Sequence, residues 1–458
     1  MPDPIPTLEQ ILALDRAHVI HPISEFSHDL SRDTKIFTGG RGVELTLADG
    51  RTLIDGFSGL FNINVGHGRT EIAEAVAAQM RELAYYPSFW DFGNEPAARL
   101  ADRVTKLLPA DRGLRHFLFN NSGSEANEAN FKIAKLYHSA LGKPWKTKIL
   151  SRRWSYHGAT RSAGSATGIG AYHAMLEQDA NHIYVSPPYC YRCEFKKTYP
   201  DCGLPCAADV EAVIEREGAE TVAALIVEPV MGTGGILVPP PDYFAEIAEI
   251  CRRHDVLLIL DEVITGFGRT GRWFGMEHWD IHPDLVSFAK GISSGYLPLS
   301  ASVISDRVYD TLRDAMPEGI PFMFGLTYNN HPACCAAALA NLDTVILLDT
   351  HHSDLEREAY VVFPTRHATE KSGTLTNHAG RVQRIEQAVE PRFESYADGE
   401  VLNRLGVALG LAGFEGDYDP RAVSREIAAS VPAFAGIDLD SLGEEGAVLA
   451  GSSDQAES

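Results

Sequence analysis

Basic residues are scarce in this chain, and long apolar runs are missing. Its 40 Lys and Arg residues stand against 62 Asp and Glu among 458 residues, so the formal net charge is −22. A charge of that sign repels nucleic acid and anionic membrane surfaces, and we expect neither as a partner. No apolar run approaches the roughly 18 residues that a membrane span needs, and we expect no leader peptide. The sequence therefore predicts a cytoplasmic protein.

Cysteine is also scarce, with seven residues in all. Four of them, Cys190, Cys193, Cys202 and Cys206, lie close together, and thiolates at such spacing are able to bind zinc. The second pair is spaced CxxxC, however, and only eight residues separate the two pairs. This spacing favours reduced thiols in a surface loop. We predict no metal site and keep structural zinc as the alternative.

Hydropathy patterns predict an α/β fold with a mainly parallel sheet and helices on both of its faces. Residues 1–70 form an N-terminal segment of short strands, with an alternating run at 43–47 and a turn signal at 48–51. Residues 71–343 form a large domain in which amphipathic helices and apolar strands alternate. The expected helices cover 71–83, 96–108, 125–141, 242–254 and 333–343, and the expected strands cover 116–120, 222–228 and 256–263.

The composition changes after residue 343. Two short strands are expected, at 344–349 and 359–363. Residues 441–458 are rich in glycine, serine and acidic side chains, which predicts disorder.

A lysine and a carboxylate lie where a sheet of this kind places its chemistry. Asp261 comes near the end of the apolar run 256–263, and Lys290 follows in the segment 287–291. Such a pair suggests a pyridoxal 5′-phosphate (PLP) site, in which the lysine holds the cofactor as a Schiff base and the carboxylate keeps the pyridine nitrogen protonated. Released from the cofactor, Lys290 is a general base and acid. The alternative is a solvated lysine before a glycine turn.

Three further groups suit the same cofactor. Ser122, Gly123 and Ser124 follow a strand and open a helix, where N–H groups and hydroxyls bind phosphate; an ordinary helix cap is the alternative. Tyr156 offers an aromatic face for a pyridine ring. Glu228 ends another apolar run, where a buried carboxylate needs a partner.

Two segments give these residues a family resemblance. The run from Asp261 to Gly271, with Lys290 following 29 residues after Asp261 (290 − 261), resembles the signature of class-III (ω-type) aminotransferases, which are PLP enzymes of fold type I. The run from Asn121 to Glu128 resembles the phosphate loop of that family.

The resemblance implies a role for each matching residue. Lys290 is the catalytic lysine, and the phosphate contacts lie at Ser122, Gly123 and Ser124. Tyr156 stacks on the ring, Glu228 lies beside the ring hydroxyl, Asp261 pairs with the pyridine nitrogen and Val263 lies under the ring. Thr327 resembles a threonine that reaches the phosphate bound in the neighbouring subunit, which implies a homodimer with shared active sites.

The family resemblance also implies a reaction. The expected enzyme moves an amino group from an ω-amino acid or amine to a keto acid such as pyruvate by a ping-pong mechanism. Phe61 and Trp90, with Tyr156, are expected to wall an apolar amine pocket, unless the first two are core aromatics. An aminomutase or decarboxylase reaction stays open.

The tail, residues 344–440, resembles a different family. Residues 344–440 resemble the C-terminal part of the large iron–sulfur, molybdopterin-oxidoreductase-like subunit of NADH:quinone oxidoreductase, but they contain no cysteine to bind a cluster. This implies a fused chain with an atypical small domain. The alternative function is a PLP-binding but catalytically impaired fusion, and an electron-transfer subunit would have only the four clustered cysteines for ligation.

Overall fold

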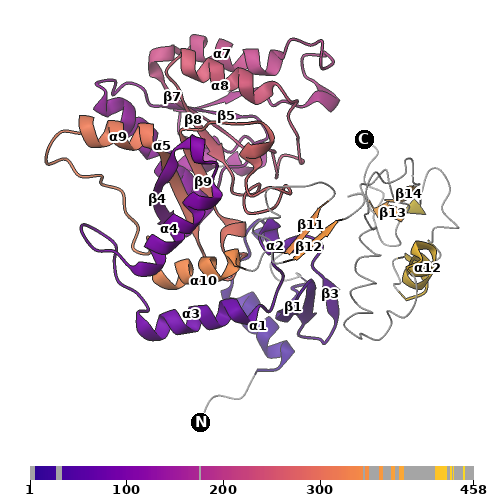
Figure 1. The fold of residues 1–458 in the computed structure, drawn as a ribbon. Coiled ribbons are helices and arrows are strands. Elements are labelled where there is room, and N and C mark those ends of the chain that lie inside the picture. The colour runs from indigo at the N-terminus through magenta and orange to yellow at the C-terminus, as the bar shows by residue number, and fades with distance from the viewer. Residues whose placement is uncertain are drawn as a thin grey trace. The chain divides into compact units, whose positions relative to one another are not determined.

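The computed structural model describes most of the first three quarters of the chain. The described residues are 6–26, 33–174 and 177–343, followed by 346–349, 361–364, 373–376, 381–385, 418–430, 434–435, 437 and 447–448. Contacts divide the chain into two units, Met1–Thr344 and Val345–Ser458 (Figure 1). Each unit is described by itself.

The N-terminal part of the first unit consists of a helix and a small antiparallel sheet. Helix α1 (Leu8–His18) starts at a capping box in which Thr7 and Gln10 exchange hydrogen bonds. Strands β1 (Phe37–Arg41), β2 (Glu44–Leu47) and β3 (Thr52–Ile54) pair in that order. The alternating run and turn predicted at 43–51 are thereby confirmed.

The centre of the first unit is a seven-stranded sheet in the order β4-β10-β9-β8-β7-β5-β6. All neighbours from β9 to β6 are parallel, whereas β10 runs antiparallel to both β9 and β4. The predicted, mainly parallel sheet is confirmed, although the antiparallel β10 was not foreseen. The strands are β4 (Leu114–Asn120), β5 (Lys148–Arg152), β6 (His182–Val185), β7 (Val222–Val227), β8 (Leu257–Asp261), β9 (Leu285–Phe288) and β10 (Ser300–Ser305).

Helices cover this sheet. The longest, α5 (Gly123–Ala140), lies across β4, β10, β9, β8 and β7, while α8 (Tyr243–Arg253) packs on β8 and α7 (Pro205–Glu217) on β6. Every expected helix is present within a few residues of its predicted bounds. The remaining α-helices described in the first unit are α2 (Ser58–Phe61), α3 (Thr70–Glu82), α4 (Glu95–Leu107), α6 (Arg161–Ala166), α9 (Asp306–Ala315) and α10 (Pro332–Leu342).

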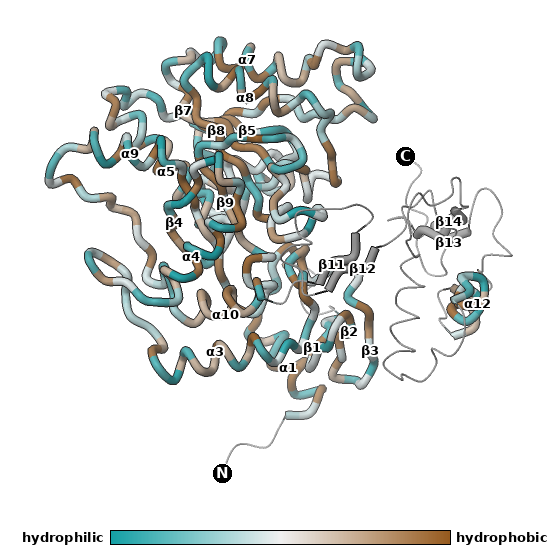
Figure 2. The backbone as a smooth tube through the Cα atoms, viewed as in Figure 1, coloured by the Kyte–Doolittle hydropathy of each residue, from teal (hydrophilic) through white to brown (hydrophobic). Residues whose placement is uncertain are grey.

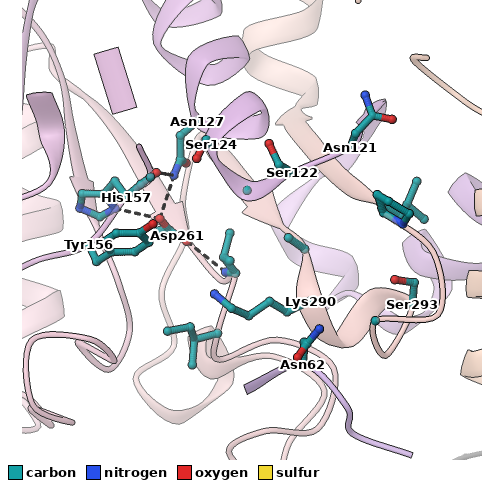
Figure 3. A pocket seen from close by; sticks show the side chains of 18 of the residues that line it. Asn62, Asn121, Ser122, Ser124, Asn127, Tyr156, His157, Asp261, Lys290 and Ser293 are labelled. Carbon is teal, nitrogen blue, oxygen red and sulfur yellow. Dashed lines mark hydrogen bonds and ion pairs between the residues drawn. The ribbon is translucent and has the colours of Figure 1, made fainter. Parts of the chain in front are cut away.

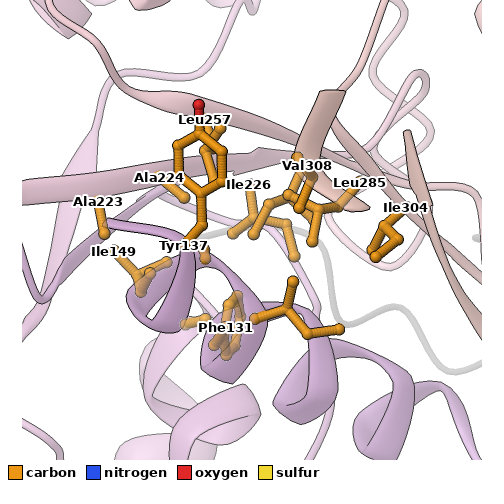
Figure 4. Packing of buried hydrophobic residues seen from close by; sticks show 14 of the residues in the cluster. Phe131, Tyr137, Ile149, Ala223, Ala224, Ile226, Leu257, Leu285, Ile304 and Val308 are labelled. Carbon is orange, nitrogen blue, oxygen red and sulfur yellow. The ribbon is translucent and has the colours of Figure 1, made fainter. Parts of the chain in front are cut away.

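The core lies between the sheet and its helices. Phe131 and Tyr137 of α5 pack against Ile226, Ile259 and Leu285 on one face of the sheet (Figure 4). All residues of β7, β8, β9 and β10 are buried, so the side chains on the opposite face are covered as well. The central strands are accordingly among the most hydrophobic parts of the chain (Figure 2). Burial of a strand face specifies the register in which neighbouring strands pair.

The described residues of the second unit form two small sheets and a helix. Strands β11 (Ile346–Asp349) and β12 (Val361–Pro364) pair in parallel, close to where two strands were expected. Strands β13 (Gly373–Thr376), β14 (Arg381–Ile385) and β15 (Ala447–Val448) form an antiparallel sheet, and α12 spans Pro420–Ser430. Apart from β15, the disorder predicted for residues 441–458 lies outside the described residues. No helix among the described residues is long and apolar enough to span a membrane.

Candidate active site

Three parallel strands end side by side, and their carboxyl ends form one wall of a cavity. The register places Val227 beside Leu260, and Asp261 beside Ser287, so Glu228, Asp261 and Lys290 lie at neighbouring strand ends. The cavity has a volume of about 400 Å³ (Figure 3). Every residue predicted to bind the cofactor, Thr327 excepted, lines it: Ser122, Gly123, Ser124, Tyr156, Glu228, Asp261, Val263 and Lys290.

Asp261 is a buried carboxylate held by three donors. Its Oδ2 accepts hydrogen bonds from Asn127 Nδ2 at 2.9 Å and His157 Nδ1 at 2.8 Å, and its Oδ1 accepts one from Val263 N at 3.0 Å. Burial by itself raises the pKa of Asp261, but these donors stabilise the anion, and the net effect lowers the pKa below its ordinary value. Asp261 is therefore ionised at neutral pH although it is only 3% exposed.

Lys290 points toward Asp261 from the turn that follows β9 (Figure 3). Burial lowers the pKa of its amine, while the charges of Asp261 and Glu228 oppose that shift only in part. A lowered pKa increases the neutral fraction of the amine, which is the nucleophilic form. Helix α10 stabilises this turn, because Asn341 Nδ2 donates to the carbonyls of Gly291 at 2.9 Å and Ile292 at 3.1 Å.

The amino end of α5 forms a cup at the edge of the cavity. Ser122 caps the helix by accepting a hydrogen bond from Glu125 N at 3.3 Å, and Gly123 and Ser124 in the first turn line the cavity. The amino terminus of a helix attracts anions through its N–H groups and the positive end of its dipole. A second loop closes on this cup. Gly158 has φ +137°, and a Cβ there would lie 2.4 Å from Ser124 Oγ, so only glycine permits the approach.

Glu228 lies at the end of β7 beside a buried cation. Burial raises the pKa of Glu228, and the charges of His157 and Arg152 lower it in part. Arg152 is fully buried; its Nη2 donates to the Glu228 carbonyl at 2.6 Å and lies 3.6 Å from Glu228 Oε2. Tyr156 is partly buried and its ring lies 5.2 Å from that of Tyr172.

This set of groups fits PLP. The cup on α5 suits a phosphate dianion, the anionic Asp261 suits a protonated pyridine nitrogen, and no hydrogen bond from the described residues occupies the Lys290 amine. Tyr156 and Val263 supply apolar surface on the cavity wall. The donor and acceptor chemistry of the cavity therefore matches each part of this cofactor.

Three predicted residues lie outside this cavity. Trp90 is 83% exposed and makes T-shaped ring contacts with Phe89 and Phe92. Phe61 packs against Phe57, and Thr327 is exposed, its carbonyl accepting a hydrogen bond from Tyr85. Their expected roles stay predictions.

Sequence reasoning assigned no role to Asn127, His157 or Arg152. Asn127 lies within the 121–128 motif and His157 adjoins Tyr156, so both were adjacent to a recognised signal. Their partner Asp261 is 134 and 104 residues away in the sequence, however, and only the fold brings them together.

The clustered cysteines form no preassembled ligand set. Cys190, Cys193, Cys202 and Cys206 are all free thiols, and Cys206 is buried. Among the described residues, no three of their sulfur atoms lie within 4.8 Å of one another. The geometry therefore gives the zinc alternative no support.

Comparison with known proteins identifies the family. The class-III aminotransferase model matches residues 29–361. Diaminobutyrate–2-oxoglutarate transaminase of Halomonas elongata is 36% identical over 426 residues, 91% of this chain and 90% of that protein. β-Alanine–pyruvate aminotransferase of Pseudomonas aeruginosa is 39% identical over 334 residues, 72% of this chain and 73% of that protein.

A solved transaminase structure also resembles this chain in fold. The amine transaminase of an uncultivated Pseudomonas species, in its PLP-bound form, has a TM-score of 0.69 and 39% identity, and the match covers 71% of this chain and 74% of that one. The expected fold type I is thereby confirmed.

The comparisons do not support the predicted oxidoreductase-like tail. The family match continues 18 residues beyond the expected boundary (361 − 343). The Halomonas relative, moreover, aligns over 91% of the chain and so extends into the tail, whereas the β-alanine–pyruvate aminotransferase aligns over 72%. The sequence likeness had rested on short runs of residues in a segment without cluster ligands. Family model, relatives and solved structure agree that this chain belongs to the class-III aminotransferases and is a transaminase that uses pyridoxal 5′-phosphate.

Proposed function

We propose that this aminotransferase moves an amino group from an ω-amino acid or an amine to a keto acid such as pyruvate, by a ping-pong mechanism. The observation that carries the proposal is the convergence of Lys290 and Asp261 on one cavity at the strand ends. Relatives named for diaminobutyrate and β-alanine, both of which carry an amino group remote from a carboxylate, support the donor class. The alternative of a catalytically impaired fusion has no support in the comparisons.

Each residue at the cavity has a proposed task. The bound cofactor supplies an electron sink for the carbon that carries the amino group. Lys290 Nζ would hold the cofactor between turnovers and, once released, would carry the proton from the substrate carbon to the cofactor carbon. Asp261 Oδ1 and Oδ2 stay ionised and stabilise a positive charge on the pyridine nitrogen. Ser122, Gly123 and Ser124 bind the phosphate and fix its position.

The remaining walls of the pocket favour apolar donors. Glu228 would lie beside the ring hydroxyl, and Val263 and Tyr156 would supply apolar contacts to the ring. Phe61 and Trp90 would extend the apolar wall on the donor side. The exposure of Trp90 in the single chain supports a wall that is completed by a second copy.

We propose a homodimer with shared active sites, in which Thr327 reaches the phosphate of the partner. An exposed aromatic surface supports this proposal: Tyr86, Trp90, Phe92 and Tyr328 are 50%, 83%, 48% and 56% exposed. Tyr86 and Trp90 both contact Phe92, and Tyr328 contacts Tyr85, which precedes Tyr86 in the chain. Apolar surface of this kind is typical of a subunit interface. The cytoplasmic location stays a prediction of the sequence.

Sedimentation analysis tests the dimer. Trp90→Asp should shift the protein from two copies toward one, because a charge would be buried in the interface. Tyr191→Asp is the matched control, since Tyr191 is an equally exposed aromatic, at 85%, on another loop. A monomeric parent protein would refute the proposal.

Absorption spectroscopy tests the proposed function. The parent protein with PLP should show a visible band that is lost on adding an ω-amino acid or amine, and that returns with pyruvate. Lys290→Ala should not form the parent band. A parent band that never responds to any amine would contradict the donor class, whereas an equal band in Lys290→Ala would contradict the role of the lysine.

A further inference from the structure

A chain of buried polar side chains leads from β10, two strands away in the sheet, to Asp261 on β8. It runs from Ser302 on β10 through Asn130 on α5, Ser287 on β9 and Asn127 on α5. All five residues are at most 3% exposed. Apolar side chains of similar size would fill this space, so the polar ones call for a reason other than volume.

The fold places these side chains between one face of the sheet and the helix that covers it. Asp261 pairs with Ser287, and Ser287 with Ser302, across three adjacent strands, so the three side chains point to the same face. Asn127 and Asn130 are three residues apart on α5 and share the helix side that covers that face. Helix and strands therefore contribute alternate members of the chain.

Each hydrogen bond in the chain has a fixed direction. Ionised Asp261 only accepts, so Asn127 presents Nδ2 to it at 2.9 Å and turns Oδ1 to Ser287. Ser287 must then donate to Asn127 Oδ1, which it does at 2.6 Å, and accept from Asn130 Nδ2 at 2.7 Å.

The hydrogen bond between Ser302 and Asn130 continues the same direction. Asn130 Oδ1 accepts from the Ser302 hydroxyl, so all four donors point toward Asp261. The orientation of Asn127 is fixed twice, because its other amide hydrogen goes to the His157 carbonyl at 2.7 Å. Aligned donors polarise one another, and their combined dipole ends at the carboxylate.

We propose that Asn130 and Ser302 are positioning residues that keep Asp261 ionised and oriented toward the cofactor ring, although neither touches the cavity. The proposal rests on the proposed role of Asp261 as partner of the pyridine nitrogen. Ser302 supplies the first donor, Asn130 and Ser287 relay it, and Asn127 delivers it to Oδ2. Loss of the first donor weakens every later bond, whereas a purely structural role would affect folding alone.

The test measures the protonation of the pyridine nitrogen by ¹⁵N NMR, with ¹⁵N-labelled PLP on the complete protein. The parent signal should stay that of a protonated nitrogen between pH 6 and pH 9. In Ser302→Ala it should move toward the unprotonated position within that range, with a PLP dissociation constant raised about tenfold, which corresponds to ~1.4 kcal/mol. Ser302→Thr keeps the hydroxyl and should restore the parent values.

Control variants separate this effect from general damage. Ser151 on β5 is also fully buried, but its hydroxyl has no partner among the described residues, so Ser151→Ala should leave the ¹⁵N signal unchanged. If Ser302→Ala does not fold, Asn130→Ala removes the next link and should give the same shift. A parent-like ¹⁵N titration in both variants overturns the proposal.

Asp261→Asn separates the role of Asp261 from that of the donor chain. If this variant keeps a protonated nitrogen, the assigned role of Asp261 is wrong. If it loses the proton while Ser302→Ala and Asn130→Ala do not, the role of Asp261 stands and only the donor chain is refuted.

Discussion

Replacing His157 with phenylalanine should destabilise the protein by an amount that depends on Asp261. The His157 side chain is fully buried, and its Nδ1 donates to Asp261 Oδ2 at 2.8 Å. Its Nε2 has no partner among the described residues, so the substitution removes a single hydrogen bond. A hydrogen bond to a charged group contributes ~1.5–3 kcal/mol. We expect the free energy of unfolding of the cofactor-free protein to fall by that amount near pH 7.5.

A double-mutant cycle isolates this contribution. Urea unfolding would be measured for the parent, His157→Phe, Asp261→Asn and the double variant. Once Asp261 is an uncharged amide, His157→Phe should cost ~1 kcal/mol or less, because the charge that the imidazole stabilises has gone. The PLP dissociation constant of His157→Phe should also rise about tenfold. Equal costs of His157→Phe in the two backgrounds would refute the view that this histidine acts through Asp261.

Three further predictions concern the cup, a buried acid and the core. Gly158→Ala should raise the PLP dissociation constant at least about tenfold in a fluorescence titration, because its Cβ would lie 2.4 Å from Ser124 Oγ; Gly170→Ala, with open space around it, should be neutral. Burial raises the pKa of Glu262 to about 7 from an ordinary 4.5, so its contribution to stability is complete below pH 4.5 and is lost as pH rises through 7. Denaturant titrations from pH 5 to pH 8 should show this loss in the parent and a flatter profile in Glu262→Gln. Phe131→Ala should cost ~3–5 kcal/mol in urea unfolding, since Phe131 is 2% exposed in the core under α5, and a cost under ~1 kcal/mol would contradict that packing.

The sequence was most informative where chemistry and periodicity coincide. Lys290 and Asp261 were identified because a charged residue at the end of an apolar strand is rare and costly. The parallel strands β7 and β8 were identified because burial on both faces gives unbroken apolar runs. In each case a local pattern carries the physical cause.

Other features depend on partners that local patterns do not contain. Strand β10 reads Ser300-Ala-Ser-Val-Ile-Ser305, too small and polar to resemble a central strand, yet it is wholly buried because its hydroxyls bond to α5 and the cup. The role of His157 requires a carboxylate 104 residues away. Thr327 and Trp90 lie outside the cavity of a single chain, so their predicted roles depend on a second copy.

The antiparallel strand β10 also sets an order of events during synthesis. Strand β4 is the end strand of the sheet and β10 is its one neighbour there, yet 179 residues separate Asn120 from Ser300 (300 − 120 − 1). A growing chain that has already released β4 and α5 from the ribosome therefore holds an unpaired strand until residue 305 emerges. Pairing over such a sequence distance is slow, and an unpaired strand invites association with other chains. The cup at the end of β4 is thus among the first parts of the site to be made and among the last to be assembled.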